Sequence, residues 1–213
     1  MRTSVTRIQE AVQHTRGVFD RKAFLIVRML LFAAIGALAW ADGPVQYDYR
    51  VLATTRTSTT EKEMNEAAEH GYTFMGVMGG ETGFAGKEVV IVMSKNLNAN
   101  GASRKRYKLL ATSRTGTMQK EIQQAGDEGF EYLGQTVFQS GFGGREVCVI
   151  LQRDLEKATR RFQYKLLSTT RTSTMQKELR EAGEAGFEFL GMTVGKTAMG
   201  GNEVVCFLRK ALE

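Results

Sequence analysis

The sequence predicts an α+β protein of three tandem βαββ modules, with helices packed on antiparallel or mixed sheets and an export signal in front. The string TTRTSTMQKE at 169–178 recurs almost unchanged at 112–121 and 54–63, and self-similarity at a fixed period identifies repeats. An apolar segment near the N-terminus ends in small residues. We therefore assign residues 1–41 to a signal peptide, 48–95 to repeat 1, 106–153 to repeat 2 and 163–210 to repeat 3.

Each repeat opens with a strand pattern. The segments YRVLATTR, YKLLATSR and YKLLSTTR start at Tyr49, Tyr107 and Tyr164, and their alternation fits a half-buried strand. A capping-box pattern comes next, with Ser58 three residues before Glu61, and predicts a helix start. The corresponding pairs are Gly116 with Gln119 and Ser173 with Gln176.

The helix of each repeat is expected to bury one apolar stripe and to end at a glycine. The stripe is Met118, Ile122, Ala125 and Gly126 in repeat 2 and Met175, Leu179, Ala182 and Gly183 in repeat 3. This spacing places the residues on one helix face, where the small ones allow close approach to a sheet. A glycine followed by an aromatic residue then predicts a left-handed helix end. These glycines are Gly71, Gly129 and Gly186.

Two further strands complete each repeat. The second reads YTFMGV, FEYLGQTV or FEFLGMTV, and the third reads KEVVIVMS, REVCVILQ or NEVVCFLR. The third strand is apolar on both faces, whereas one helix can cover only one face of a sheet. A module of this size alone would also be marginally stable. We therefore expect the repeats to pack into one body, through stacked sheets or shared edges.

The segments GFEYLG at 129–134 and GFEFLG at 186–191 complete a pattern of helix, glycine, aromatic residue, glutamate and apolar strand. This pattern resembles a family of small bacterial βαββ domains of unknown function, in which a Gly-Trp-Glu-Leu-like segment holds this place. The resemblance covers most of residues 48–210, three times over. Tyr or Phe stands where the family has Trp, and Thr73 replaces Glu in repeat 1. The resemblance implies the fold and no chemical activity.

The N-terminal segment has the three parts of an export signal. Arg21, Lys22 and Arg28 precede the apolar run MLLFAAIGALAWA, which ends in an A-x-A sequence at Ala41. We expect export to the bacterial periplasm or the exterior. An uncleaved membrane anchor is the alternative, although Arg28 would be costly inside a bilayer. The segment DRKAFLI resembles a twin-arginine motif with Lys22 at its second position, so the Sec and Tat routes both stay open.

Cleavage after Ala41 is the first testable prediction. The exported protein should have the mass of a chain that starts at Asp42, because signal peptidases cut after small residues. Intact-mass spectrometry of the exported protein measures this. A mature species that retains Met1 would contradict the prediction.

The charge distribution argues against nucleic acid as a partner. The formal net charge is +6, and residues 1–41 carry four of these charges. The remaining chain is nearly balanced, so it lacks the basic surface that nucleic-acid binding requires.

The sequence predicts no catalytic, cofactor-binding or metal-binding residues and no cofactor. His70 is the one histidine after the leader, and the other repeats have no histidine at its position. Cys148 and Cys206 occupy different registers of their strands and should point to opposite sheet faces. Free buried thiols are therefore the expected state, with a disulfide as the alternative in an oxidising compartment.

The Thr-x-Arg-Thr strings allow two interpretations. In the structural one they cap helices, and Arg56, Arg114 and Arg171 pair with Glu63, Glu121 and Glu178. In the functional one, helix amides, threonine hydroxyls and guanidinium groups bind a phosphate, sulfate or carboxylate. The candidate anion-binding residues are Arg56, Thr57, Arg114, Thr115, Arg171 and Thr172. They would converge if the modules surrounded a pseudo-threefold axis.

These observations favour an exported, non-enzymatic protein that acts through binding or assembly. The alternative is a periplasmic binding protein for small molecules or anionic ligands that uses the Thr-x-Arg-Thr strand ends. The expected partners are an unknown protein or a small anionic ligand, and an oligomer is compatible with the sequence. Membrane contact is expected only through an uncleaved leader.

Overall fold

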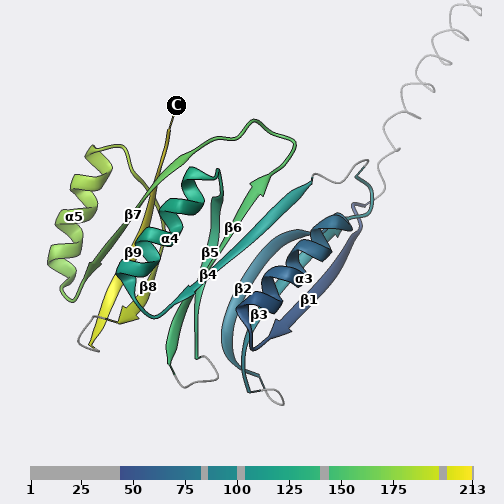
Figure 1. Ribbon diagram of the computed structural model, residues 1–213, viewed down its shortest axis with the longest axis horizontal. Coiled ribbons are helices and arrows are strands. Elements are labelled where there is room, and N and C mark those ends of the chain that lie inside the picture. The colour runs from purple at the N-terminus through teal and green to yellow at the C-terminus, as the bar shows by residue number, and fades with distance from the viewer. Residues whose placement is uncertain (1–43, 83–85, 100–103, 140–143, 197–200, 213) are drawn as a thin grey trace, which may run out of the picture. The chain divides into compact units, whose positions relative to one another are not determined.

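The computed structural model describes residues 44–82, 86–99, 104–139, 144–196 and 201–212 (Figure 1). The predicted signal peptide lies outside these residues. Gln46–Glu213 form one compact unit, to which all three modules belong. The element order of this unit confirms three βαββ modules and an α+β fold.

The elements of the three modules have nearly equal lengths. Module 1 comprises β1 (Tyr47–Thr54), α3 (Thr57–Glu69), β2 (Thr73–Thr82) and β3 (Gly86–Asn96). Module 2 comprises β4 (Lys105–Thr112), α4 (Thr115–Asp127), β5 (Glu131–Gln139) and β6 (Arg145–Asp154). Module 3 comprises β7 (Phe162–Thr169), α5 (Thr172–Glu184), β8 (Glu188–Lys196) and β9 (Asn202–Ala211). Each module forms one antiparallel three-stranded sheet with its third strand in the centre, so the mixed-sheet alternative does not apply to these strands.

The helix ends agree with the sequence prediction. Gly71 adopts φ 86°, a left-handed conformation that glycine enters without steric cost. Its N–H donates to Ala68 O, and the next N–H, of Tyr72, donates to Ala67 O. This is the Schellman arrangement, which satisfies carbonyls left over at the helix end. The other two helices end in the same way at Gly129 and Gly186.

The helix starts differ from the predicted capping boxes. The N-cap residue of α3 is Arg56, two residues before Ser58, and no side chain of the described residues caps the helix. Thr54 Oγ1 instead accepts a hydrogen bond from the Arg56 N–H at 3.1 Å. Arg114 with Thr112 and Arg171 with Thr169 repeat this turn. A threonine that binds the backbone two residues later stabilises such turns, which accounts for the threonine that is repeated two positions before each of these arginines.

A basic side chain covers the aromatic residue that comes after each helix. Arg50 lies 4.8 Å from the ring centroid of Tyr72, and Lys108 lies 4.7 Å from that of Phe130. Lys165 occupies the same position over Phe187. These cation–π contacts fasten the start of the second strand to the first strand of the same module. The repeated glycine-aromatic segment therefore has a structural role.

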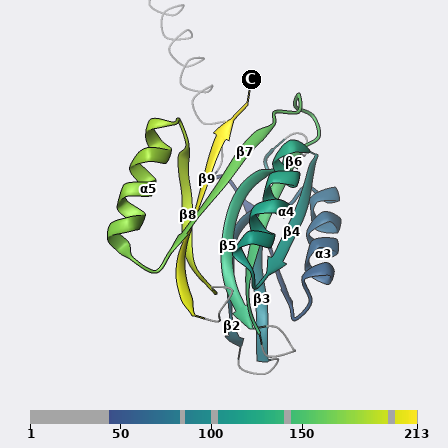
Figure 2. The same cartoon turned by 60° about the vertical axis from the view of Figure 1, so that its left-hand side comes forward.

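The three modules form a stack. Each of the first two helices packs on its own sheet and also on the first strand of the next module, α3 on β4 and α4 on β7. Figure 1 shows the three modules side by side in chain order, and Figure 2 shows the third sheet between α4 and α5. Neighbouring sheets also meet along β2 and β5, where a Cβ added to Gly79 would lie 2.5 Å from Val137 O. The lack of a side chain at Gly79 permits this approach.

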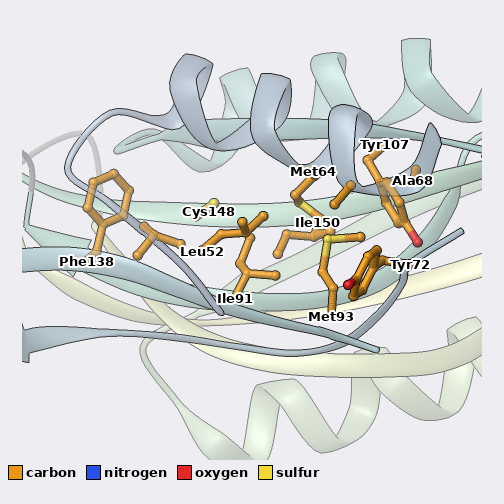
Figure 3. Close-up of a cluster of buried hydrophobic side chains, with 12 residues drawn as sticks. Leu52, Met64, Ala68, Tyr72, Ile91, Met93, Tyr107, Phe138, Cys148 and Ile150 are labelled. Atoms are coloured by element: carbon orange, nitrogen blue, oxygen red, sulfur yellow. The ribbon is translucent and has the colours of Figure 1, made fainter. Parts of the chain in front are cut away.

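The cores are therefore shared between modules. In the first junction, Met64 and Ile91 of module 1 pack with Tyr107, Cys148 and Ile150 of module 2 (Figure 3). In the second, α4 and β6 pack against β7 and β9. Because burying apolar surface is the main source of stability, we expect the stack to unfold as a single cooperative unit.

The third strands confirm the two-faced pattern of the sequence in modules 2 and 3. Four consecutive residues of β6, Cys148 to Leu151, are fully buried and point alternately into the first and second junctions. In β3, Ile91 is fully buried, whereas its neighbours Val90 and Val92 are only partly covered. The outer face of the first sheet thus lacks the cover that the other two sheets receive.

The arrangement is not pseudo-threefold. A closed ring of three modules would bury the first strand, β1, against the last helix, α5. Tyr49 on β1 is instead 61% exposed, and Gly183 on α5 has no atom within 4 Å of an added Cβ. The same junction is repeated twice without closing, so the two ends of the stack remain open.

Candidate interaction surfaces at the two ends of the stack

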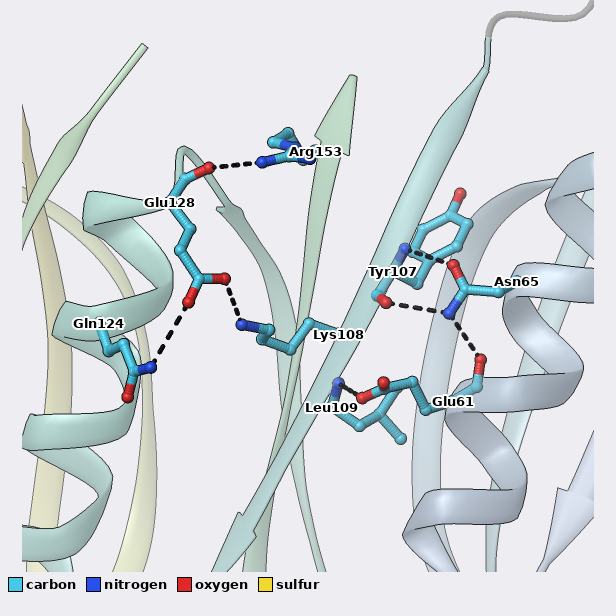
Figure 4. Close-up of polar contacts among 8 residues, drawn as sticks. All are labelled: Glu61, Asn65, Tyr107, Lys108, Leu109, Gln124, Glu128 and Arg153. Carbon is cyan, nitrogen blue, oxygen red and sulfur yellow. Dashed lines mark hydrogen bonds and ion pairs between the residues drawn. The ribbon is translucent and has the colours of Figure 1, made fainter. Parts of the chain in front are cut away.

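Polar side chains of α3 form hydrogen bonds with backbone groups of β4, the edge strand of the next sheet. Asn65 Oδ1 accepts from the Tyr107 N–H at 2.9 Å, and its Nδ2 donates to Tyr107 O at 3.0 Å (Figure 4). Glu61 Oε2 accepts from the Leu109 N–H at 2.9 Å. An edge strand otherwise exposes a row of unpaired backbone groups. The helix therefore replaces a missing fourth strand for β4.

The second junction repeats these contacts with glutamines. Gln123 Oε1 accepts from the Tyr164 N–H at 2.8 Å, and its Nε2 donates to Phe162 O at 3.2 Å. Gln119 Oε1 accepts from the Leu166 N–H at 2.7 Å, while its Nε2 donates to Tyr164 O at 3.1 Å. Glu61 and Gln119 are the residues that the capping-box pattern assigned to their own helix starts. Their actual partners are 48 and 47 residues away in the chain.

The repeated tyrosine of the first strand joins consecutive modules. Tyr107 Oη accepts from the Phe74 N–H at 2.9 Å, beside a bulge in β2. Tyr164 Oη accepts from the Tyr132 N–H at 2.8 Å and donates to Phe130 O at 3.0 Å. Burial raises the pKa of Tyr164 to about 12, so its hydroxyl keeps the proton that it donates. The tyrosine repeated in the sequence is thus a junction residue.

Gly126 allows the tyrosine ring to approach the helix. A Cβ at this position would lie 2.5 Å from Phe162 O and 2.7 Å from Tyr164 Cδ2. The sequence predicted that small residues at the end of the stripe permit close packing on a sheet, and the sheet is that of the next module.

The outer face of the first sheet carries exposed apolar side chains. We call this the first-sheet face, and it comprises Tyr47, Tyr49, Val51, Met75 and Met78, which are 51–62% exposed. The equivalents of Tyr49 in modules 2 and 3, Tyr107 and Tyr164, are 1% and 3% exposed. The difference arises because no module precedes module 1 in the compact unit. The first-sheet face therefore has the composition of a protein contact while being open to solvent.

The opposite end of the stack, formed by α5 and β8 of module 3, also carries exposed side chains. We call it the last-module face, and it comprises Gln176, Arg180 and Gly183 on α5 and Phe189, Met192 and Val194 on β8. All six residues are exposed, with Phe189 at 50%. Eight of the eleven large apolar side chains that are exposed in the described residues lie on the two end faces. Exposed apolar groups that cluster in this way mark interaction surfaces.

The candidate anion-binding residues do not gather at one place. Arg56, Arg114 and Arg171 are exposed N-cap residues of three different helices. A cavity of about 10 Å³ is lined by Arg114 and Thr115 but by neither Arg56 nor Arg171. Among the residues that the structure describes, these arginines form no ion pair with Glu63, Glu121 or Glu178, so the predicted ion pairs are wrong.

One member of the candidate set has a structural partner. Thr115 Oγ1 donates to Glu203 Oε1 at 2.5 Å and links module 2 to module 3. Thr115 is therefore a junction residue, like Gln119 on the same helix.

The two cysteines are free and buried in different clusters, as their registers indicated. Burial raises the pKa of Cys148 to about 12 and also raises the pKa of Cys206. An unfolded thiol ionises near pH 8.5. Above about pH 8.5 the thiols of the unfolded chain ionise while the buried thiols of the folded protein keep their protons. The free energy of unfolding should therefore be highest below about pH 8.5 and should fall as the pH rises further.

Both thiols should resist alkylation by iodoacetamide at pH 8 in the folded protein, because the thiolate is the reactive form and both groups are covered. Both should react after unfolding in guanidinium chloride. Mass spectrometry counts the adducts in each state. Equal labelling rates before and after unfolding would contradict the burial of these residues.

No protein-family model, curated protein or solved structure matches this chain. Across the described ranges, no helix is long and apolar enough to cross a membrane. The same residues contain no group of three or more His, Cys, Asp or Glu side chains placed to hold a metal ion.

Proposed function

We propose that this is an exported, non-enzymatic protein that acts through binding or assembly, and that the first-sheet face is its contact surface. The observation that carries this proposal is the contrast between equivalent tyrosines. Tyr107 and Tyr164 are buried by a preceding module, whereas Tyr49 is 61% exposed. A protein partner would cover Tyr49 in the same way.

The chemistry of the face suits a protein partner. Aromatic residues and methionine are enriched in protein interfaces, and two tyrosines and two methionines stand on this face. β1 is also an edge strand with one side unpaired in its sheet, so it offers backbone hydrogen bonds beside the apolar side chains. A partner that supplies polar side chains to the edge and apolar groups to the face would satisfy both.

Site-specific photocrosslinking tests this proposal. A benzophenone side chain at position 49 should form adducts with a protein in the producing cells. The matched control is position 62 on α3, where the Lys62 side chain is 77% exposed but lies away from the end faces. Adducts are expected from position 49 and not from position 62. Equal, background-level yields from both positions would contradict the proposal.

Anionic ligands are the second candidate. The observation that favours them is that all three helices lack both an acidic residue in the first turn and a side-chain cap. Free amides and the helix dipole attract anions there. Because the three sites lie on successive modules, a long polyanion would have to span them to gain avidity.

Replacing Arg56, Arg114 and Arg171 together by Gln tests the second candidate. The triple variant should lose salt-sensitive binding to heparin while its circular dichroism spectrum stays unchanged, since the guanidinium groups are exposed. Replacing the equally exposed Lys62, Lys120 and Lys177 by Gln gives a control with the same change in charge. Identical heparin elution of both variants would rule out this site.

A further inference from the structure

We propose that the partner of the first-sheet face is the last-module face of a second copy of this chain, so that copies stack head to tail. The proposal rests on the proposed function and names its partner. Two internal junctions already show how one module binds the next. The two ends of the stack present the unused halves of a third such junction. Its contacts can be derived from equivalent positions, which are 58 and 57 residues apart.

Both groups needed for the tyrosine hydrogen bond, the hydroxyl on one end face and the backbone N–H on the other, are present. At the two internal junctions, a tyrosine hydroxyl accepts a hydrogen bond from an N–H at the bulge of the preceding module. Module 3 has the same bulge, between Phe189 and Gly191, and the N–H at the equivalent position is that of Phe189. Tyr49 is the equivalent tyrosine, and it is exposed. The hydroxyl of Tyr49 in one copy would therefore accept from the Phe189 N–H of another.

The hydrogen bonds between helix side chains and an edge strand can also form at the proposed junction between copies. Gln176 occupies the position of Gln119, which binds the carbonyl of the repeated tyrosine and the N–H two residues later. Across a junction between copies, Gln176 would bind the Tyr49 carbonyl and the Val51 N–H. Arg180 occupies the position of Gln123. Arginine has no acceptor, so it would donate to the Tyr47 carbonyl and could not form the second bond that Gln123 makes across its junction, in which Gln123 accepts from a tyrosine N–H.

The shapes of the two faces agree with this pairing. Gly183 is equivalent to Gly126, which accommodates a tyrosine ring, yet a Cβ at Gly183 would meet nothing within 4 Å. On the other face, Gly76 is equivalent to Gly134, which is approached to 3.8 Å by side chains of the preceding module, and Gly76 is also open. The ring of Tyr49 would lie on Gly183, and Phe189 and Met192 would cover Gly76. Each open glycine thus faces exposed apolar groups of the other end.

The symmetry of the contact determines the kind of assembly. The two faces differ, so the interface is heterologous, and a heterologous contact either closes a ring or extends into an open stack. Within one chain, two successive junctions leave both ends exposed. The same step continued between copies would extend the stack and leave one face free at each end. We therefore expect a concentration-dependent series of oligomers.

The experiment uses the full-length gene product and two variants, one for each face. Tyr49→Lys places a charge on the first-sheet face, and lysine is tolerated on exposed edge strands. Gly183→Lys places a long side chain where the Tyr49 ring would lie, and lysine suits the last turn of a helix. Lys177→Ala is the control, because this side chain is 78% exposed on α5 but lies outside the last-module face. Thermal unfolding verifies that each variant folds.

Sedimentation velocity should show that the average mass of the parent protein and of Lys177→Ala rises with concentration. Tyr49→Lys and Gly183→Lys should each remain monomeric when alone. An equimolar mixture of these two variants should form a dimer that grows no further, because each retains the face that the other lacks. Such complementation is specific to a heterologous contact.

Two results would overturn the inference. The first is a parent protein that stays monomeric up to about 1 mM, a concentration at which contacts with millimolar Kd values are populated. The second is self-association that Tyr49→Lys abolishes and Gly183→Lys leaves intact, which would indicate a symmetric dimer of first-sheet faces. If the parent is monomeric while position 49 crosslinks to a different protein, the head-to-tail inference fails and the proposed function stands.

Discussion

Tyr164→Ala should lower the free energy of unfolding by about 3–5 kcal/mol, the range for truncating a large buried aromatic side chain. Tyr164 is 3% exposed, and its hydroxyl bonds with the backbone of Phe130 and Tyr132. Truncation leaves a cavity in the second junction and removes both bonds. Tyr49→Ala, at the equivalent position of module 1, should change the stability by less than about 0.5 kcal/mol because that side chain is exposed.

Urea denaturation followed by circular dichroism measures both variants, at a protein concentration low enough for the parent to be monomeric. The comparison is internal, because both tyrosines open the same strand pattern and precede the same type of helix. Equal losses of stability in the two variants would show that Tyr49 is covered within the monomer. That outcome would also remove the basis for a contact surface on the first sheet.

The same substitution at two equivalent glycines should have effects of opposite sign. Gly126→Ala should destabilise the protein by about 1–3 kcal/mol, as overpacking of a dense core does. Its Cβ would lie 2.5 Å from Phe162 O, a backbone atom that cannot rotate away. Gly183→Ala meets nothing within 4 Å, so the higher helix propensity of alanine should stabilise the protein by up to about 1 kcal/mol.

Thermal and urea denaturation of the two variants provide the measurement, at a protein concentration low enough for the parent to be monomeric. Module 1 supplies a useful reference, because Ala68 occupies the equivalent position and is buried in the first junction. A Gly126→Ala variant as stable as the parent would mean that the second junction can relax to accommodate alanine as the first does. A destabilised Gly183→Ala variant would mean that α5 is covered, contrary to its open environment.

Local structure could be predicted where its causes are local. The left-handed end at Gly71 needs a glycine and an apolar neighbour, and both are adjacent in the sequence. The stripe through Met118 and Ile122 reflects helical periodicity, and both residues are buried as predicted. The two-faced pattern of the third strands likewise predicted that the modules would share cores.

The partners of polar residues could not be predicted in this way. Glu61 has the spacing of a capping box, yet it binds the N–H of Leu109, 48 residues along the chain. Gln119 behaves in the same way toward Leu166, 47 residues away. A carboxylate or an amide can bind any nearby backbone group, and which group is nearby depends on how the modules pack. The spacing of the residues within one helix contains no information about this.

The sequence by itself determined that one βαββ unit is written three times, with its strands, its helix and its glycine end. Only the tertiary structure decided which copy of each residue is buried. Tyr49, Tyr107 and Tyr164 stand in nearly identical segments, yet the first is exposed and the other two are covered. The physical reason is that short-range sterics and hydrogen bonds determine an element from its own residues. Burial, in contrast, depends on the neighbour across the junction, and in this stack the first sheet and the last helix have none.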